Sequence, residues 1–403
     1  DPAYYEAGLK LYYREYTNLD ERRALFEVVI PGSMKESQRV WTSNRASFTP
    51  YRKEVSVTGD LAGAVYGSAL WPYTLRFVGQ EGGAMTIAMP SILTQPWNPI
   101  NGSNWIYDQS LNRATQDLGT ISDPWTGLAK PQRIEKAEVT AQADLPIGAG
   151  TASASWLTFT QADTIEVPAD AWVDWNAETE TWITVGEAFT QTQTALIKSV
   201  VTYPANLWDV KWHDGTPINI ADFVMYMIQR FDRASELSDV YDPAAATSLR
   251  SLKAVFKGFR ITSEDPLVIE YYTDNWYADA ENDVTTLWPN YGYGSASWYS
   301  LAVGLRAEAA GETAFSSAKA EELEKEWMSY LSGPTVEILK AHLDAAAAEN
   351  YIPYAATLGK WITPETATTA WANYTEWFRQ RGHLWIGLGP YYVERAFPVE
   401  GMV

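Results

Sequence analysis

The chain contains no cysteine among its 403 residues, which excludes disulfides, thiolate metal sites and cysteine nucleophiles. Histidine is nearly as scarce: there are three, and none has a partner at the spacing of a zinc pair. A glycine-rich phosphate loop and a G-x-S-x-G nucleophile elbow are both missing. No apolar run approaches the roughly 18 residues that a membrane-spanning helix needs. We therefore expect no metal, no cofactor and no enzymatic activity.

Positive charge is also in short supply, because 30 Lys and Arg face 50 Asp and Glu and leave a net charge of −20. A chain this acidic is repelled by nucleic acids and by anionic membrane surfaces. The charge balance predicts that nucleic acid is not a partner.

Aromatic residues, in contrast, are abundant, with 19 Trp and 24 Tyr. Large rings fill cores and sheet faces, and they also line ligand pockets, where they stack on sugars or enclose peptide side chains. Composition alone leaves both interpretations open.

The segment from Trp208 to Phe223 carries the most local information. Alternating apolar residues predict a strand over 208–212, and the sequence at 213–217 is typical of a turn. Asn219 and Asp222, three residues apart, form the pattern of a capping box. Apolar residues at three- and four-residue spacing then predict an amphipathic helix over 220–233.

This segment resembles the signature of the family 5 extracellular solute-binding proteins, the oligopeptide- and dipeptide-binding components of ABC importers. Further matches follow the family's order: Trp97-Asn-Pro-Ile100, the strand-like 265–271, and the G-x-G-P-Y turn of 387–391. We assign to folding the matched residues Trp212, Asp214, Gly215, Pro217, Asp222, Gly389 and Pro390.

The resemblance implies an α/β fold of mixed α+β character, with periplasmic-binding-protein-like type II lobes whose mixed sheets are flanked by helices. A ligand, peptide or oligosaccharide, would be enclosed between two lobes and passed to an ABC transporter permease. The protein would then be extracellular or periplasmic and anchored at the cell surface. Seven residues beside these motifs and in an aromatic loop are expected to contact the ligand: Trp97, Asn98, Trp105, Tyr107, Trp288, Tyr291 and Tyr391. For each of them, packing in the core is the alternative role.

The chain departs from the family pattern at both ends, which suggests a long variant or a fragment lacking much of lobe II. Residues 1–80 resemble the late part of such a protein. Residues 81–130 with 386–403 are expected to form the lobe I core, and 131–385 an enlarged lobe I subdomain that carries the signature. A surface left by a missing lobe would also allow self-assembly.

Periodicity and end signals predict the remaining elements. Helices are expected at about 2–16, 20–42, 105–117, 317–331, 334–349 and 364–381. Strands are expected within 52–78, at 84–89, through much of 131–200 and at 267–273, whereas 235–260 shows little periodicity.

Two other functions stay open. An acidic, aromatic-rich binding-protein fold could serve as a structural subunit of a surface layer or filament. A carbohydrate-active enzyme would need two carboxylates, which any of the 50 acidic residues could supply. A peptide site should offer an acidic and a basic group for the two termini, whereas a sugar site should offer stacked Trp.

Overall fold

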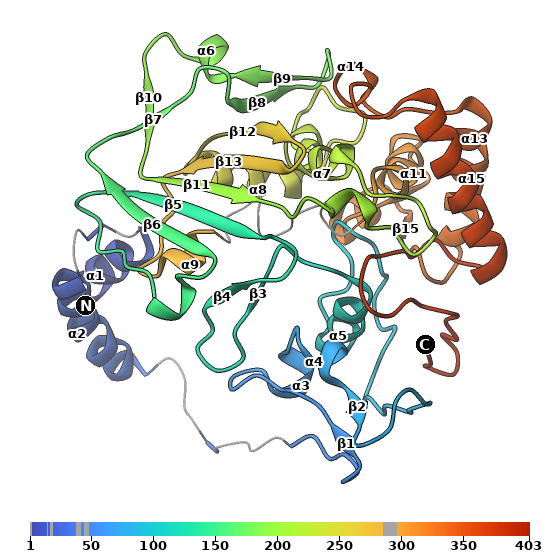
Figure 1. Cartoon of the computed structure of the whole chain (residues 1–403), viewed down its shortest axis with the longest axis horizontal. Coiled ribbons are helices and arrows are strands. Elements are labelled where there is room, and N and C mark those ends of the chain that lie inside the picture. Colours follow the sequence, from blue (N-terminus) through green and yellow to red (C-terminus); the bar gives the residue numbers. More distant parts are fainter. Residues whose placement is uncertain (1, 14, 17–18, 38–41, 44–47, 285–295) are drawn as a thin grey trace.

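A computed structural model describes residues 2–13, 15–16, 19–37, 42–43, 48–284 and 296–403. In these residues the chain has the predicted mixed α/β fold, built around a seven-stranded sheet (Figure 1). The strand order is β6-β5-β11-β13-β12-β8-β9; β5 and β6 are parallel and the other neighbours antiparallel. These strands are β5 (Lys136–Gln142), β6 (Leu157–Ala162), β8 (Trp172–Asn176), β9 (Thr181–Thr184), β11 (Ile197–Thr202), β12 (Phe256–Glu264) and β13 (Leu267–Thr273).

Side chains on β5 and β11 alternate between core and surface, as on a sheet with one buried face, whereas every residue of β13 from Ile269 to Thr273 is buried. Val139 of β5 and Val201 of β11 are completely buried, as is Ile269 of β13. The prediction that 131–200 is mainly sheet is confirmed, as is the strand at 267–273.

Helices cover the sheet and extend the core away from it (Figure 1). α7 (Ile220–Asp232) packs against β8, and α8 (Pro243–Lys253) packs against β12. Beyond α7 lies a group formed by α11 (Trp298–Ala309), α13 (Thr335–Glu349) and α15 (Pro364–Arg381). The helices predicted at 220–233, 334–349 and 364–381 are confirmed, and the last begins after the N-cap Thr363.

A smaller region precedes the sheet in sequence and surrounds α5 (Ile106–Thr115), the helix expected at 105–117. The short elements beside it are β1 (Val55–Ser56), α3 (Ala64–Gly67), α4 (Trp71–Thr74), β2 (Arg76–Phe77), β3 (Thr120–Ser122) and β4 (Ala129–Pro131). The remaining short elements are η1 (Thr151–Ser153), β7 (Ile165–Val167), α6 (Val185–Ala188), β10 (Gln193–Ala195), η2 (Leu207–Asp209), α9 (Ala280–Asp283), β14 (Thr313–Ala314), α12 (Ser317–Glu322), β15 (Glu326–Trp327) and α14 (Ala355–Leu358).

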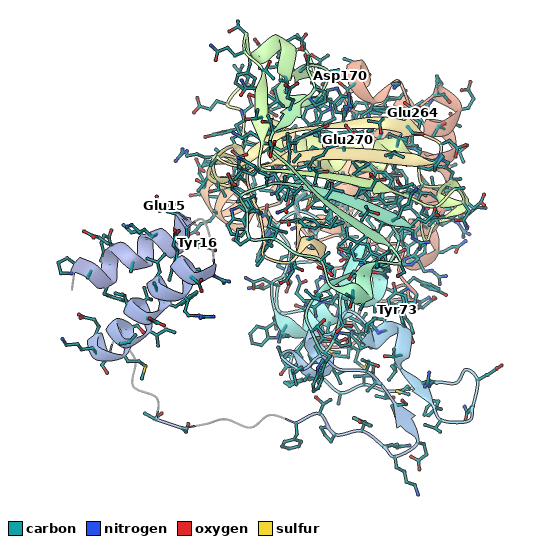
Figure 2. All side chains as sticks on the ribbon, turned by 60° about the vertical axis from the view of Figure 1, so that its left-hand side comes forward. Glu15, Tyr16, Tyr73, Asp170, Glu264 and Glu270 are labelled. Carbon is teal, nitrogen blue, oxygen red and sulfur yellow. The ribbon has the colours of Figure 1, made fainter. Side chains whose placement is uncertain are left out.

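The two helices at the start of the chain, α1 (Pro2–Tyr13) and α2 (Leu19–Glu36), form a hairpin beside the main body (Figure 2). Tyr16, between them, packs edge-on against Trp276 with ring centroids 5.6 Å apart. Both helices were predicted, but they end earlier than expected: residues 15–16 and 42 are not helical, and α2 stops at Glu36 because Ser37 has a positive φ of 46°. Residues 38–41 of the expected helix lie outside the described residues.

Two strand predictions are wrong. Residues 84–89 form no strand, because this segment pairs with no neighbour and instead lines two cavities. The predicted strand over 208–212 is replaced by the 3₁₀ turn η2, which begins where Leu207 N–H donates to the carbonyl of Pro204. Alternation of apolar residues in so short a run does not distinguish a strand from a turn packed on a core.

Other boundaries also differ. Within 52–78, the strands are the short pair β1 and β2, while an isolated bridge between Asp60 and Ala64 and two short helices fill the interval. The helix expected to reach residue 331 ends at Glu322, since Glu324 has a positive φ and β15 then pairs with β14. Residues 235–260 contain α8 and the start of β12, whose partner β13 is supplied by tertiary pairing.

Candidate functional site

The signature turn is held by its own backbone and by Asp214. Trp212 N–H donates to the Thr216 carbonyl at 2.8 Å, and Gly215 N–H donates to the Trp212 carbonyl at 2.8 Å. Gly215 has φ +89°, a conformation that favours glycine. Thr216 N–H donates to Asp214 Oδ1 at 2.9 Å, as expected for an Asp before Gly in a turn. The other carboxylate oxygen accepts from the Tyr299 hydroxyl at 2.8 Å, which joins the turn to α11.

Asp222 collects three N–H donors from separate parts of the chain. Its Oδ2 accepts from Asn219 N–H at 2.9 Å, which with the Asn219 side chain forms the predicted capping box. The same oxygen accepts from the Trp212 indole at 3.4 Å, and Oδ1 accepts from Trp298 N–H at 2.8 Å. Complete burial raises the pKa of Asp222 to about 7, against the opposing effect of these donors. This carboxyl group therefore ties the turn, the start of α7 and the start of α11 together.

The G-x-G-P-Y segment lies directly against the signature turn. His213 N–H donates to the Gly387 carbonyl at 3.0 Å, and Gly387 N–H donates to Nδ1 of His213 at 3.1 Å. Gly389 N–H then donates to the Thr115 carbonyl at the end of α5 at 2.9 Å. A Cβ on Gly389 would lie 2.5 Å from the Ala114 carbonyl oxygen. The two segments singled out by sequence thus meet, and glycine permits the contact.

The loop containing Trp97 and Asn98 joins this region to the segment around β14 and β15. Asn98 is buried; its Nδ2 donates to the Phe315 and Met328 carbonyls at 3.1 and 3.0 Å. Trp97 is 1% exposed, and its ring packs edge-on against Trp385 with centroids 5.3 Å apart. In the described part of the chain no acceptor meets the Trp97 indole N–H.

Three more of the predicted ligand residues lie nearer the surface. Trp105 is 42% exposed and packs edge-on against Tyr107, with ring centroids 5.9 Å apart. Tyr391 is 44% exposed and stacks on Trp71. Trp288 and Tyr291 lie outside the described residues. The assignment of all seven residues to a ligand stays a prediction.

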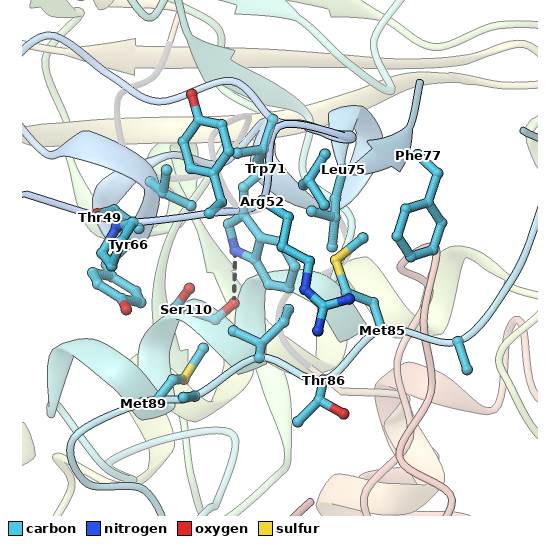
Figure 3. A pocket seen from close by; sticks show the side chains of 18 residues that line it. Thr49, Arg52, Tyr66, Trp71, Leu75, Phe77, Met85, Thr86, Met89 and Ser110 are labelled. Carbon is cyan, nitrogen blue, oxygen red and sulfur yellow. Dashed lines mark hydrogen bonds between the residues drawn. The ribbon is translucent and has the colours of Figure 1, made fainter. Parts of the chain in front are cut away.

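Two cavities of about 460 and 470 Å³ share Trp71 as a wall, and both are lined largely by apolar side chains. In the first, Leu75 and Met85 converge beside Trp71, whose indole N–H donates to the Ser110 carbonyl at 3.1 Å (Figure 3). Trp97 and Tyr391 both line the second. The structure thus brings these two predicted residues to one apolar cavity.

A larger polar cleft of about 710 Å³ lies on another side of α5. It is bordered by the loop that carries Asn98, by the end of α5, by α7 and by the start of α12, with Trp327 and Trp385 in its wall. Its amide and hydroxyl side chains are Gln95, Asn98, Asn101, Ser103, Asn104, Gln109, Asn112, Gln116, Tyr226, Ser316 and Ser317. Among the described lining residues, Arg230 alone carries a charge.

The signature helix α7 contributes two side chains to this cleft. Tyr226 and Arg230 lie one helical turn apart and are half-buried, whereas every other residue of α7 is buried. Sequence reasoning missed this pair, although polar positions four residues apart on an apolar helix signal an exposed stripe. Trp385 and Asn112 carried no such signal, since the tertiary fold alone brings them to the cleft.

The wall of the cleft is supported by a buried ion cluster. Arg233 is 2% exposed, and its guanidinium pairs with Asp242 at 3.0 Å and Glu308 at 3.2 Å. The same guanidinium donates to Asn101 Oδ1 at 3.4 Å. The cluster fixes the position of the Asn101 loop relative to α7.

Across the described ranges, His, Asp and Glu side chains form no group of three arranged to hold a metal ion. The described helices also include none with the length and hydropathy needed to cross a bilayer. No protein-family model matches the chain, and no curated protein shows significant similarity to it.

Proposed function

We propose that this protein is an extracellular solute-binding protein that captures peptides or oligosaccharides for delivery to an ABC importer. The observation that carries the proposal is the polar cleft of about 710 Å³ between the Asn98 loop and α7. Its volume lies within the range of small-molecule sites, roughly 300 to 1,000 Å³. Both borders belong to segments that resemble the family's motifs.

The lining of the cleft suits a polar ligand. Amides can donate and accept, so they pair with hydroxyl groups and with peptide units alike. Trp327 and Trp385 add flat apolar surface of the kind that sugars and peptide side chains contact. The importer as partner and the extracellular location derive from the motif resemblance.

The test is ligand capture by the purified protein. Native mass spectrometry of the protein, compared with its denatured mass, should reveal a retained small molecule. Thermal-shift measurements against oligosaccharide and peptide libraries should identify a class that raises the melting temperature. Ser317→Trp, which places a large ring in the cleft, should abolish the shift. Ser251→Trp, which makes the same change on exposed α8, should not.

Absence of any retained molecule, together with no shift from either library, would overturn the proposal. An equal shift in wild-type protein and Ser317→Trp would show that binding occurs elsewhere. Either result would move the search to the two apolar cavities or to another function.

A further inference from the structure

Arg230 is placed unusually for a cation in so acidic a chain. It lies half-buried in the polar cleft, and no ion pair joins it to a carboxylate in the described part of the chain. Arg233, three residues further on, is buried between Asp242 and Glu308. Of these two neighbouring guanidinium groups, one is neutralised within the fold and the other faces a cavity.

The groups around Arg230 reinforce this contrast. The described lining residues include many amides and hydroxyls but no Asp or Glu. Asn112, 7% exposed, also lines the cleft, and its Oδ1 is enclosed without a hydrogen-bond partner in the described residues. A buried amide oxygen without a hydrogen-bond partner costs free energy. If the Asn112 side chain rotates so that its Oδ1 accepts from a ligand hydroxyl, that new hydrogen bond offsets the cost. Trp327 adds a half-buried ring.

This combination discriminates between ligand classes. A free peptide carries an amine that would need a carboxylate partner, and none is found among the described lining residues. A neutral sugar would use the amides but leave Arg230 without a counter-charge. A sugar acid uses both, because its carboxylate accepts two parallel N–H bonds from a guanidinium while its hydroxyls pair with amides.

We propose that the cleft binds acidic oligosaccharides built of uronic acid units, with a ligand carboxylate on Arg230. The inference rests on the proposed capture function and specifies its ligand. The sugar hydroxyls pair with the amides of the cleft, and a sugar face lies on Trp327. The amides give affinity for the polyol, and Arg230 supplies the selection for the acid.

Isothermal titration calorimetry with matched ligands tests the proposal. The ligands are trimers of galacturonate, glucuronate and mannuronate, their carboxyl-reduced neutral counterparts, and trialanine with and without an N-terminal acetyl group. At least one uronate trimer should bind at least 10-fold more tightly than its reduced counterpart. Acetyl-trialanine separates the contribution of a carboxylate alone from that of a sugar acid.

Variants of the full chain locate the effect. Arg230→Gln should weaken uronate binding by roughly 10- to 100-fold, the loss expected when a hydrogen bond to a charged group is removed. Arg230→Lys should retain part of the affinity, because it keeps the charge but not the planar fork. Arg250→Gln, the same change on exposed α8, should bind as the wild type does. An unchanged melting temperature of each variant confirms folding.

The possible outcomes distinguish failure of the acidic-sugar inference from failure of the proposed ligand-capture function. If reduced trimers or trialanine bind as tightly as every uronate, or if Arg230→Gln matches the wild type, the acidic-sugar inference fails while ligand capture stands. If none of these ligands binds and the native protein retains no small molecule, both fail.

Discussion

His213 and Gly387 hold each other through two hydrogen bonds, one from each backbone N–H. Because Nδ1 of His213 accepts, Nε2 carries the proton of the neutral ring and donates to the Gly389 carbonyl at 3.0 Å. One imidazole therefore connects the signature turn to a segment more than 170 residues away. The same segment also bonds to the end of α5. Because this segment and α5 both line the apolar cavity beside Trp97 and Tyr391, the position of the segment affects the shape of that cavity.

Gly389→Ala should destabilise the protein strongly. The new Cβ would meet the Ala114 carbonyl oxygen and Gln116 N at 2.5 Å, and both belong to backbone that cannot rotate away. Overpacking of this kind costs about 1–3 kcal/mol and occasionally more. Urea unfolding measures the loss. Gly148→Ala is the matched control, since nothing lies within 4 Å of its added Cβ, and equal losses in the two variants would contradict the close approach.

Asp222→Ala should also lower the free energy of unfolding, by about 3 kcal/mol or more. The substitution removes the carboxylate that accepts from Asn219 N–H, Trp298 N–H and the Trp212 indole, and a buried donor that loses its acceptor costs about 1–3 kcal/mol. Asp209→Ala, on an exposed position of η2, should change stability by no more than about 0.5 kcal/mol. Chemical denaturation of both variants beside Trp212→Phe, which removes one donor, checks the prediction; a smaller loss in Asp222→Ala than in Trp212→Phe would refute it.

His383 should contribute a loss of stability on acidification, in the direction opposite to Asp222, whose raised folded-state pKa favours the folded state as pH falls. Burial lowers the pKa of His383 to about 4, and the neutral ring accepts from Trp385 N–H while Nε2 pairs with the Val393 carbonyl. At this histidine the unfolded chain has the higher pKa and binds protons first, so the stability that His383 contributes is complete above about pH 6.5 and declines toward pH 4. The decline from this group should reach about 2 kcal/mol by pH 5.

Denaturant unfolding of wild type and His383→Gln at pH 7.5 and pH 5 measures this effect. The variant should be less stable than wild type at pH 7.5, and the difference between the two should shrink at pH 5. Identical pH dependence in wild type and His383→Gln would rule out the assignment. Burial also lowers the pKa of His213, so the double variant His213→Gln/His383→Gln should lose the least stability between pH 7.5 and pH 5.

The sequence by itself determined those helices whose first residues and buried faces are specified by residues close together in the chain. Asn219 and Asp222 specify the start of α7, Thr363 and Pro364 specify the start of α15, and the apolar period of α7 specifies its buried stripe. These interactions span three or four residues, so a single segment contains both partners. The motif resemblance grouped the segments around Trp97 and Gly389 in one expected lobe core, but it put Trp212 in a separate subdomain.

The tertiary structure alone decided which faces meet. Residues 84–89 have strand-like composition but no partner strand, and they became cavity wall, while β12 formed because β13 returned beside it. Asn112, Arg230 and Trp385 are separated by more than a hundred residues at each step, yet they line one cleft. Contacts of that range depend on the packing of whole layers, a property that periodicity within a single segment does not encode.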